Sequence, residues 1–309
     1  MSNDIVNLKR RRLVQALCAL PLSGSLLSAP SAQPLIRKAI PSSGELLPVI
    51  GLGTSGVFEV GDSASERQGP FETLVALQQL GNAMVDTSPM YDEAEQVIGE
   101  LLPSLPAPAH FFLATKVWTR GRAAGIAQMN DSFRLLGTGV IDLMQIHNLL
   151  DWRTHILTLR EWKLQGRIRY SGITHYRDDA HDELARVIQQ LPDLDFVQVN
   201  YSLMEPAAEQ QLLPMCAERG IAVIANRPFA RGGWFSLTRG RPLPAWSGDY
   251  GIDSWAQFAL KWIVSHPAVT CTIPGTGKRK HMLDNMQAGF GSLLEAPTRA
   301  RMQRLMLDL

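Results

Sequence analysis

The sequence predicts an α/β protein folded as a (β/α)8 TIM barrel, with an N-terminal β-hairpin and a C-terminal extra helix. The main observation is an alternation, from residue 48 onward, of short apolar runs with longer amphipathic runs, which is typical of βα units in a parallel sheet. Eight such pairs occur, and a chain of 309 residues has the length at which α/β barrels form as one unit.

The composition indicates a globular chain without a polyanionic partner. Hydrophobic residues make up 45% and charged residues 19%, which excludes a disordered or fibrous protein. The formal net charge of +1 gives no electrostatic basis for binding nucleic acid.

The strands and helices are expected in strict alternation. Each expected strand is a short apolar run: 48–53, 83–87, 111–116, 141–147, 170–174, 196–200, 222–226 and 269–274. Each expected helix has apolar residues at steps of three and four: 71–80, 93–102, 124–136, 152–165, 178–190, 205–219, 254–265 and 278–289. Glycines such as Gly137 and Gly166 stand just past a helix, where a left-handed cap is common.

Three segments lie outside this pattern. "IRKAI" and "LLPVI" around "PSSGE" (41–45) predict a β-hairpin that closes the barrel floor, and the tail 296–309 predicts an extra helix. Residues 227–251 are rich in Gly, Pro, Arg and aromatic residues, so they are expected to form a long loop that is either functional or disordered.

Residues 1–32 are interpreted as a signal peptide of the twin-arginine type, ahead of a single barrel domain at 33–309. A basic start is followed by an apolar run from Leu13 to Leu27, which is shorter than the roughly 20 residues that span a bilayer, so no stable membrane span is expected. "RRRLVQ", with Arg10 and Arg11, resembles the twin-arginine label read by the export machinery, which predicts a periplasmic protein. A basic arm without a targeting role is the alternative.

Polar residues at the ends of successive strands form the candidate catalytic set. These residues are Asp86 after the second strand, Lys116 after the third and His147 after the fourth, with Tyr91 one short loop beyond Asp86. Active sites of such barrels lie at the carboxyl ends of the strands, so the four side chains are expected to meet.

The residue types suggest proton transfer. A buried lysine needs a carboxylate partner, and Asp86 is placed to supply it to Lys116. The positive charge is expected to lower the pKa of Tyr91 and make this phenol a proton donor near neutral pH. His147 would orient the oxygen that receives the proton.

Other chemistries lack their residues. Of the cysteines, Cys18 lies in the expected signal peptide, which leaves Cys216 and Cys271, so neither a disulfide framework nor a metal site is indicated. No nucleophile elbow and no glycine-rich dinucleotide fingerprint occurs. Aromatic residues in the loops above the strand ends are expected to form an apolar mouth: Trp118, Trp152, Trp234, Phe235 and Trp246.

From about residue 37 to 290 the chain resembles the aldo-keto reductase family. "GLGTSGVF" looks like the family's first-strand motif, "VDTSPMYDEAEQVIG" its Asp and Tyr motif, "FLATKVW" its lysine strand and "IDLMQIHN" its histidine strand. "GRIRYSGITHY" (166–176), "FVQVNYSLMEP" (196–206) and "TIPGTGKRKHMLDN" (272–285) are similar to its later cofactor-binding segments.

The resemblance implies a monomer that uses a nicotinamide dinucleotide to reduce a small-molecule aldehyde or ketone. Tyr91 would protonate the carbonyl oxygen while hydride reaches the carbon, and Asp86 would hold Lys116 beside it. The implied cofactor-binding residues are Thr54, Thr174, His175, Gln198, Asn226, Arg227, Pro228, Phe229, Arg231, Gly275, Thr276, Lys278, His281 and Asn285.

The sequence departs from the family pattern at three of these positions. His175 stands where an asparagine is usual, Asn226 where some members stack an aromatic ring, and His281 where many have an arginine. A 2'-phosphate needs a fixed positive partner, which Lys278 and its basic neighbours can supply, so NADPH is favoured and NADH remains possible. A nucleotide-binding sensor or regulatory subunit with little turnover is the alternative function, and an unrelated barrel enzyme such as a lyase is a third.

Overall fold

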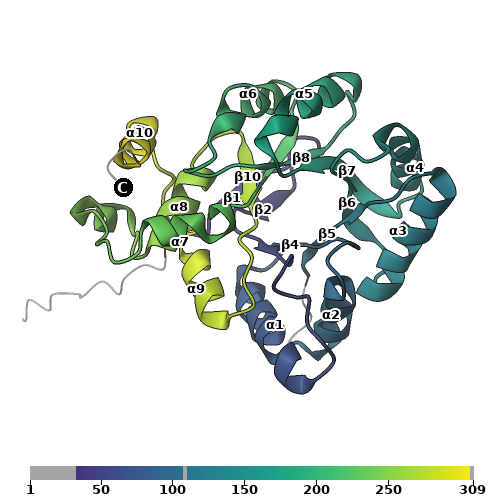
Figure 1. The fold of residues 1–309 in the computed structure, drawn as a ribbon, viewed down its shortest axis with the longest axis horizontal. Coiled ribbons are helices and arrows are strands. Elements are labelled where there is room, and N and C mark those ends of the chain that lie inside the picture. Colours follow the sequence, from purple (N-terminus) through teal and green to yellow (C-terminus); the bar gives the residue numbers. More distant parts are fainter. Residues whose placement is uncertain (1–32, 107–109, 307–309) are drawn as a thin grey trace, which may run out of the picture. The chain divides into compact units, whose positions relative to one another are not determined.

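Eight parallel strands form the centre of the fold (Figure 1). The structure is a computed structural model that describes residues 33–106 and 110–306. The predicted signal peptide in residues 1–32 therefore lies outside the described residues. The strands of the sheet pair in the order β3 (Leu52–Gly53), β4 (Met84–Asp86), β5 (Phe112–Val117), β6 (Ile141–His147), β7 (Ile168–His175), β8 (Phe196–Asn200), β9 (Ala222–Asn226) and β10 (Val269–Thr272).

Two isolated parallel bridges bring the first and last strands together. Ile50 pairs with Thr272, and Gly53 pairs with Gly275. The predicted (β/α)8 barrel is confirmed.

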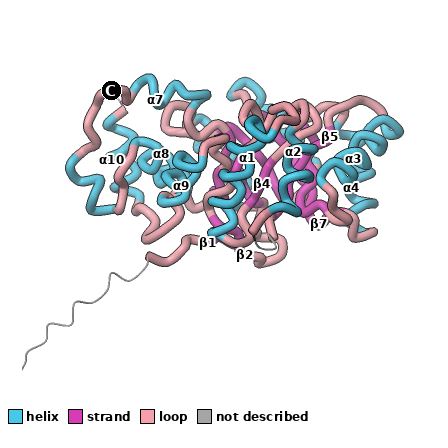
Figure 2. The backbone as a smooth tube through the Cα atoms, turned by 90° about the horizontal axis from the view of Figure 1, so that it is seen from below, coloured by secondary structure: helices cyan, strands magenta, loops and turns pink. Residues whose placement is uncertain are grey.

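Helices surround the strands on the outside of the barrel (Figure 2). The α-helices are α1 (Ala64–Leu77), α2 (Ala94–Leu101), α3 (Arg122–Leu136), α4 (Trp152–Leu164), α5 (His181–Gln190), α6 (Leu212–Glu218), α7 (Gly233–Leu237), α8 (Trp255–Val264), α9 (Arg279–Gln287) and α10 (Ala296–Leu305). Short 3-10 turns are η1 (Gln78–Leu80), η2 (Leu102–Ser104), η3 (Asp178–Ala180), η4 (Ala207–Glu209), η5 (Ala230–Gly232) and η6 (Ala245–Tyr250). Among the described residues, no helix is both long enough and apolar enough to cross a membrane.

Helix α1 differs from its prediction by starting seven residues earlier. Its first turn is fixed by a capping box in which Ser63 and Glu66 bond reciprocally. Gly69 and Pro70, residue types that disfavour helix interiors, lie inside the helix. Gly69 serves a close approach, since a Cβ there would stand only 2.5 Å from the carbonyl oxygen of Gly277.

The predicted hairpin is confirmed and seals the bottom of the barrel. It consists of β1 (Arg37–Ala39) and β2 (Leu46–Pro48), paired antiparallel with Lys38 opposite Leu47. Leu47 belongs to the apolar cluster inside the barrel, together with Phe112 and Phe196. The Lys38 ammonium donates to the carbonyl oxygens of Val264, His266 and Val269 at 2.7–2.8 Å, which ties the hairpin to the end of α8.

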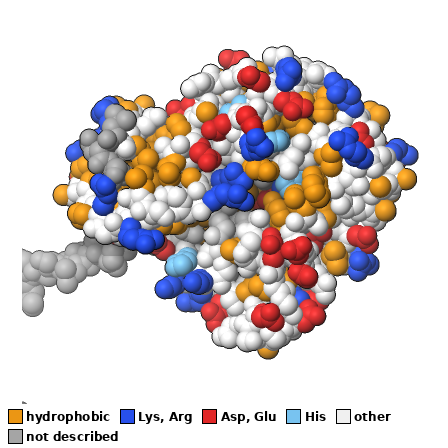
Figure 3. All heavy atoms as spheres, viewed as in Figure 1, with side chains coloured by type: hydrophobic (Ala, Val, Ile, Leu, Met, Phe, Trp, Pro, Cys, Tyr) orange, Lys and Arg blue, Asp and Glu red, His pale blue; other side chains and the backbone are white. Residues whose placement is uncertain are grey.

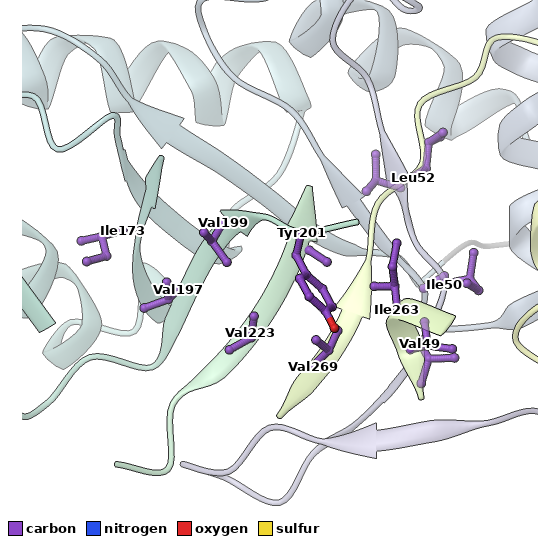
Figure 4. Packing of buried hydrophobic residues seen from close by; sticks show 14 of the residues in the cluster. Val49, Ile50, Leu52, Ile173, Val197, Val199, Tyr201, Val223, Ile263 and Val269 are labelled. Atoms are coloured by element: carbon purple, nitrogen blue, oxygen red, sulfur yellow. The ribbon is translucent and has the colours of Figure 1, made fainter. Parts of the chain in front are cut away.

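The two faces of each strand contribute to different cores. Val197, Val199, Val223 and Val269 belong to the larger cluster that also includes residues of the surrounding helices, such as Ile263 of α8 (Figure 4). Full burial of one such side chain stabilises the fold by about 1.5–3 kcal/mol. The other faces fill the barrel interior.

The segment 227–251, expected as a long loop, carries structure of its own. It contains η5, α7 and η6, and it starts with positive φ angles at Arg227, Ala230 and Arg231. The indole nitrogen of Trp234 in α7 donates to the carbonyl oxygen of Trp255 at 2.7 Å. Packing of aromatic side chains against α8 therefore orders this segment.

Candidate active site

The inward-facing side chains change from apolar to polar toward the carboxyl ends of the strands. Alternate residues of a strand face the same side. In β6 the interior residue Leu143 is followed at two-residue steps by Gln145 and His147, and in β5 Ala114 is followed by Lys116. The lower barrel is thus an apolar core, and its upper end is a layer of polar groups.

Asp86 and Lys116 form a buried ion pair in this layer. The Lys116 ammonium is completely buried and donates to Asp86 Oδ2 at 2.7 Å and to the Thr87 carbonyl oxygen at 2.7 Å. Burial by itself would lower the pKa of Lys116, but the negative charge of Asp86 and the Tyr91 phenol raise this pKa above its ordinary value. Lys116 is therefore a permanent cation at neutral pH.

Two glutamines complete the shell of Asp86. Gln145 Nε2 donates to Asp86 Oδ1 at 3.0 Å, and Gln198 Nε2 donates to the same oxygen at 2.8 Å. The carboxylate is thereby held by three side-chain donors from three strands. Sequence reasoning missed Gln145, although its spacing of two residues from His147 places both on one face of β6.

Tyr91 lies beside this ion pair in the turn between β4 and α2. Its ring centroid is 5.1 Å from the Lys116 nitrogen and 5.9 Å from the His147 ring, to which it stands at 90°. Burial raises the pKa of Tyr91, and the Lys116 charge opposes this only in part, so the net shift is upward. This corrects the expectation of a lowered pKa, because desolvation outweighs the attraction of the cation.

His147 is buried and neutral. Burial, followed by the charges of Lys116 and His175, lowers the pKa of His147 to about 2. Its Nδ1 lies 3.1 Å from the hydroxyl oxygen of Ser88, which sits in the turn after β4. The structure therefore brings all four predicted catalytic residues together.

A chain of hydrogen bonds leads from Asp86 through Gln198 to Thr174 and Asn226, which are expected to contact the nicotinamide. Gln198 Oε1 accepts from the Thr174 hydroxyl at 3.2 Å and from Asn226 Nδ2 at 3.4 Å. Asn226 Oδ1 is buried and has no hydrogen-bond partner in the described residues. Thr54 contacts the backbone of Asp86, with its backbone nitrogen and its hydroxyl both donating to the Asp86 carbonyl oxygen at 3.1 Å.

The loop after β9 and the end of β7 form a stacked group. The guanidinium of Arg227 lies 4.1 Å from the centroid of the Tyr176 ring, which in turn is stacked on His175 at 5.5 Å. Phe229 packs against Phe235 with ring centroids 4.7 Å apart. Of the remaining predicted residues in this loop, Pro228 is buried and Arg231 is exposed.

The third predicted group lies on the loop before α9 and on that helix. Gly275, Lys278 and His281 are exposed, whereas Thr276 and Asn285 are buried. Lysine and arginine side chains gather with a histidine over α9 on the face shown in Figure 3. A pocket of about 550 Å³ is lined there by Ser65, Gln68, Gly69 and Glu72 of α1 and by Gly277, Lys278, Arg279, Lys280 and Leu283.

The expected aromatic mouth is only partly present. Trp118 is 40% exposed and its ring centroid is 6.5 Å from that of His147, and Phe235 is 43% exposed. Trp234 and Trp152 are buried instead. Trp234 does not line the mouth because its ring packs against Trp255 and Phe258 of α8.

The polar layer can donate a proton and hold an oxygen atom. Tyr91 keeps its proton at neutral pH because its pKa is raised, and His147 offers a neutral imidazole beside it. Within the residues that the structure describes, no group of three or more His, Cys, Asp or Glu side chains could hold a metal ion. The arrangement suits general acid catalysis at a carbonyl oxygen.

Comparison with known proteins agrees with this chemistry. The model of the aldo/keto reductase family matches residues 49–297. Methylglyoxal reductase YeaE of Escherichia coli K12 is 30% identical over 261 residues, which cover 81% of this chain and 88% of that protein. The NADH-specific methylglyoxal reductase of the same bacterium is 27% identical over 199 residues, or 54% of this chain and 58% of that protein. A solved aldo-keto reductase from Klebsiella pneumoniae in complex with NADPH has 26% identity and a TM-score of 0.72, covering 88% of this chain and 95% of that one.

Proposed function

Because the chain belongs to the aldo/keto reductase family and is an oxidoreductase of that family, we propose that it reduces aldehydes or ketones to alcohols with NADPH, with Tyr91 as the general acid. The observation that carries this proposal is the buried pair of Lys116 and Asp86 next to Tyr91 and His147. These four side chains come from separate segments and meet at the end of the barrel where such enzymes hold their active sites.

Tyr91 would deliver the proton to the carbonyl oxygen. Its raised pKa keeps the phenol protonated before the reaction. As negative charge develops on the substrate oxygen, the Lys116 cation 5.1 Å from the ring centroid would stabilise the phenolate that remains after transfer. Solvent would then return a proton to the phenolate.

His147 would hold the carbonyl oxygen in place for this transfer. The ring is neutral, so it can donate one hydrogen bond without carrying a charge. Its edge-to-face contact with Tyr91 places both rings beside the same space. The reduced nicotinamide, when bound, supplies the hydride that the carbonyl carbon receives.

Residues of the polar layer fit the amide end of a nicotinamide. The buried Oδ1 of Asn226 is an acceptor without a partner among the described residues, and native structures rarely leave such groups unsatisfied. A carboxamide NH2 group would satisfy it. Gln198 and Thr174 lie in the same hydrogen-bonded chain and would border the nicotinamide.

The basic residues Lys278, Arg279 and Lys280 at the start of α9 support NADPH as the cofactor. Lys278 and its two basic neighbours line the pocket against α1, where a 2'-phosphate would find charged partners. Burial and the charges of Lys280 and Lys278 lower the pKa of His281, so this side chain adds a neutral donor at pH 7. The Klebsiella protein is bound to NADPH, and a relative named for NADH specificity makes NADH the alternative.

NADPH consumption tests the reaction directly. The panel should include methylglyoxal, which the E. coli relative is named for reducing, with other aldehydes, ketones and dicarbonyls. Tyr91→Phe is expected to lower kcat by about 10²- to 10⁴-fold while NADPH binding, measured by tryptophan fluorescence, is retained. Tyr250→Phe is the matched control, because this tyrosine is exposed in η6 and, among the described residues, its hydroxyl pairs with that of Thr298.

Other outcomes point to other functions. Tight NADPH binding without turnover of any carbonyl compound would contradict the reductase and favour the sensor or regulatory subunit. Turnover that is equal in wild type and Tyr91→Phe would contradict the role of Tyr91 alone.

We also propose that residues 1–32 direct export to the periplasm by the twin-arginine route and that the barrel acts as a monomer. The paired Arg10 and Arg11 support the first proposal, and the supply of the whole polar layer by one chain supports the second. Replacing both arginines by lysine should leave the protein in the cytoplasmic fraction, and light scattering should give the monomer mass. Unchanged fractionation, or a stable dimer, would contradict them.

A further inference from the structure

We propose that Ser88 is a positioning residue that fixes which ring nitrogen of His147 carries the proton. The inference rests on the proposed function, in which His147 donates a hydrogen bond to the carbonyl oxygen. It adds a residue from the turn after β4 to the machinery at the end of β6.

The contact between the two residues is buried. Ser88 is fully buried, His147 is 5% exposed, and the distance from Ser88 Oγ to His147 Nδ1 is 3.1 Å. Proline at position 89 and the hydrogen bond from the Tyr91 backbone nitrogen to the Ser88 carbonyl oxygen shape the turn that presents the hydroxyl. Water therefore does not compete for this hydrogen bond.

The surroundings of Ser88 decide the direction of the bond. A serine hydroxyl can donate once and accept twice. The backbone nitrogen of Met90 already donates to Ser88 Oγ at 3.3 Å. If the ring also donated to this oxygen, the hydroxyl proton would have no acceptor among the described residues, and buried donors are seldom left in that state. Donation from Ser88 to Nδ1 gives the hydroxyl proton an acceptor and gives Nδ1 a donor.

A neutral imidazole has one proton for its two nitrogens. Because burial and nearby charges keep His147 neutral at pH 7, acceptance at Nδ1 leaves the proton on Nε2. In the described residues Nε2 has no protein partner, so its N–H is available to a substrate oxygen. The hydroxyl of Ser88 thus fixes the tautomer in which His147 Nε2–H can donate to the substrate oxygen.

Among the described residues, no neighbouring ring or hydroxyl shares this role with Ser88. Tyr91 and Trp118 flank the His147 ring at centroid distances of 5.9 and 6.5 Å and contribute no hydrogen bond to its nitrogens. The adjacent Thr87 hydroxyl is buried and makes no hydrogen bond among the described residues. In this part of the chain, Ser88 is therefore the residue that pairs with His147 Nδ1.

The tautomer can be read from the ring nitrogens of the full-length protein. Histidine is labelled with 15N, and the His147 signals are identified by their loss in His147→Gln. At pH 7 the wild type should show Nδ1 unprotonated and Nε2 protonated. Ser88→Ala should give a mixture of both forms, and Ser88→Cys, which fills the space with a weak donor, should shift in the same direction.

Kinetics should follow the spectrum. Ser88→Ala is expected to lower kcat by about 2- to 10-fold, the range that one net hydrogen bond is worth, with little change in the Kd of NADPH. Thr158→Val is the control, since it removes a buried hydroxyl without a partner from α4 and should leave both spectrum and kcat unchanged.

Two results would overturn the inference. One is a wild-type His147 protonated on Nδ1, and the other is a ring spectrum that Ser88→Ala and Ser88→Cys leave unchanged. The spectrum is read without substrate, so an absence of NADPH turnover would refute the proposed function separately.

Discussion

Replacing Asp86 by asparagine should destabilise the protein strongly although the two side chains have nearly the same shape. The carboxylate accepts from Lys116 on one oxygen and from Gln145 and Gln198 on the other. An amide has only one oxygen, so its NH2 group must face donors on one side or the other. Either orientation also leaves the Lys116 ammonium without a counter-charge in a fully buried position.

The expected loss can be estimated from the geometry. Unit charges 2.7 Å apart attract each other by about 6 kcal/mol at an effective dielectric constant of about 20. Part of this attraction offsets the desolvation of both ions, and removal of one partner of a buried pair costs about 3–5 kcal/mol. In a chain of this size such a loss lowers Tm by roughly 6–20 °C.

A double-mutant cycle isolates the pair from other effects. Free energies of unfolding are measured by denaturant titration for wild type, Asp86→Asn, Lys116→Met and the double variant. The double variant should recover at least about 2 kcal/mol relative to the sum of the single losses, because it leaves no unpaired buried charge. An Asp86→Asn protein within about 1 kcal/mol of wild type, or strictly additive losses, would refute the reasoning.

Three further predictions follow from single contacts. An unfolded histidine gains a proton below about pH 6.5, whereas burial lowers the pKa of His147 in the folded chain to about 2. As the pH falls from 7 to 4.5, wild type should therefore lose more stability than His147→Gln in denaturant titrations. Equal losses in the two proteins would contradict this. Gly69→Ala places a Cβ 2.5 Å from the Gly277 carbonyl oxygen, so it should lower the free energy of unfolding by about 1–3 kcal/mol and weaken NADPH binding in a fluorescence titration. An unchanged stability and an unchanged Kd would contradict this, because they would mean that the backbone at Gly277 moves away at little cost. Burial raises the pKa of Glu95, which accepts a hydrogen bond from Thr115, so the folded chain takes up this proton at a higher pH than the unfolded chain does. Wild type should therefore lose less stability than Glu95→Gln as the pH falls from 7 to 4.5 in denaturant titrations, and equal losses would contradict this.

Much of the fold could be predicted because its signals are local. The strands at 141–147, 196–200 and 222–226 have the bounds that were expected from their apolar runs. Helix α1 was predicted too short, since Gly69 and Pro70 look like a break until the closeness of the 275–278 loop explains the glycine. The sequence of segment 227–251 predicts a loop, because its order comes from contacts with α8, which lies later in the chain.

The part of the candidate site that could be predicted is the set of single polar residues that end apolar strands. Asp86, Lys116 and His147 end apolar strands, and their meeting follows from barrel geometry. Gln145 and Ser88 carry no such mark in the sequence, because a glutamine within a strand and a serine before a proline are usually structural. Their contacts with Asp86 and His147 join residues 59 positions apart.

The sequence by itself determined the alternation of strands and helices, the inward row of polar residues and the family to which the chain belongs. These features depend on residue spacing, which is independent of how the elements pack. The tertiary structure alone decided the upward shift of the Tyr91 pKa, the place of Trp234 and the contact between Ser88 and His147 Nδ1. The reason is that desolvation, charge and hydrogen bonding each depend on distances between segments that lie far apart in the chain.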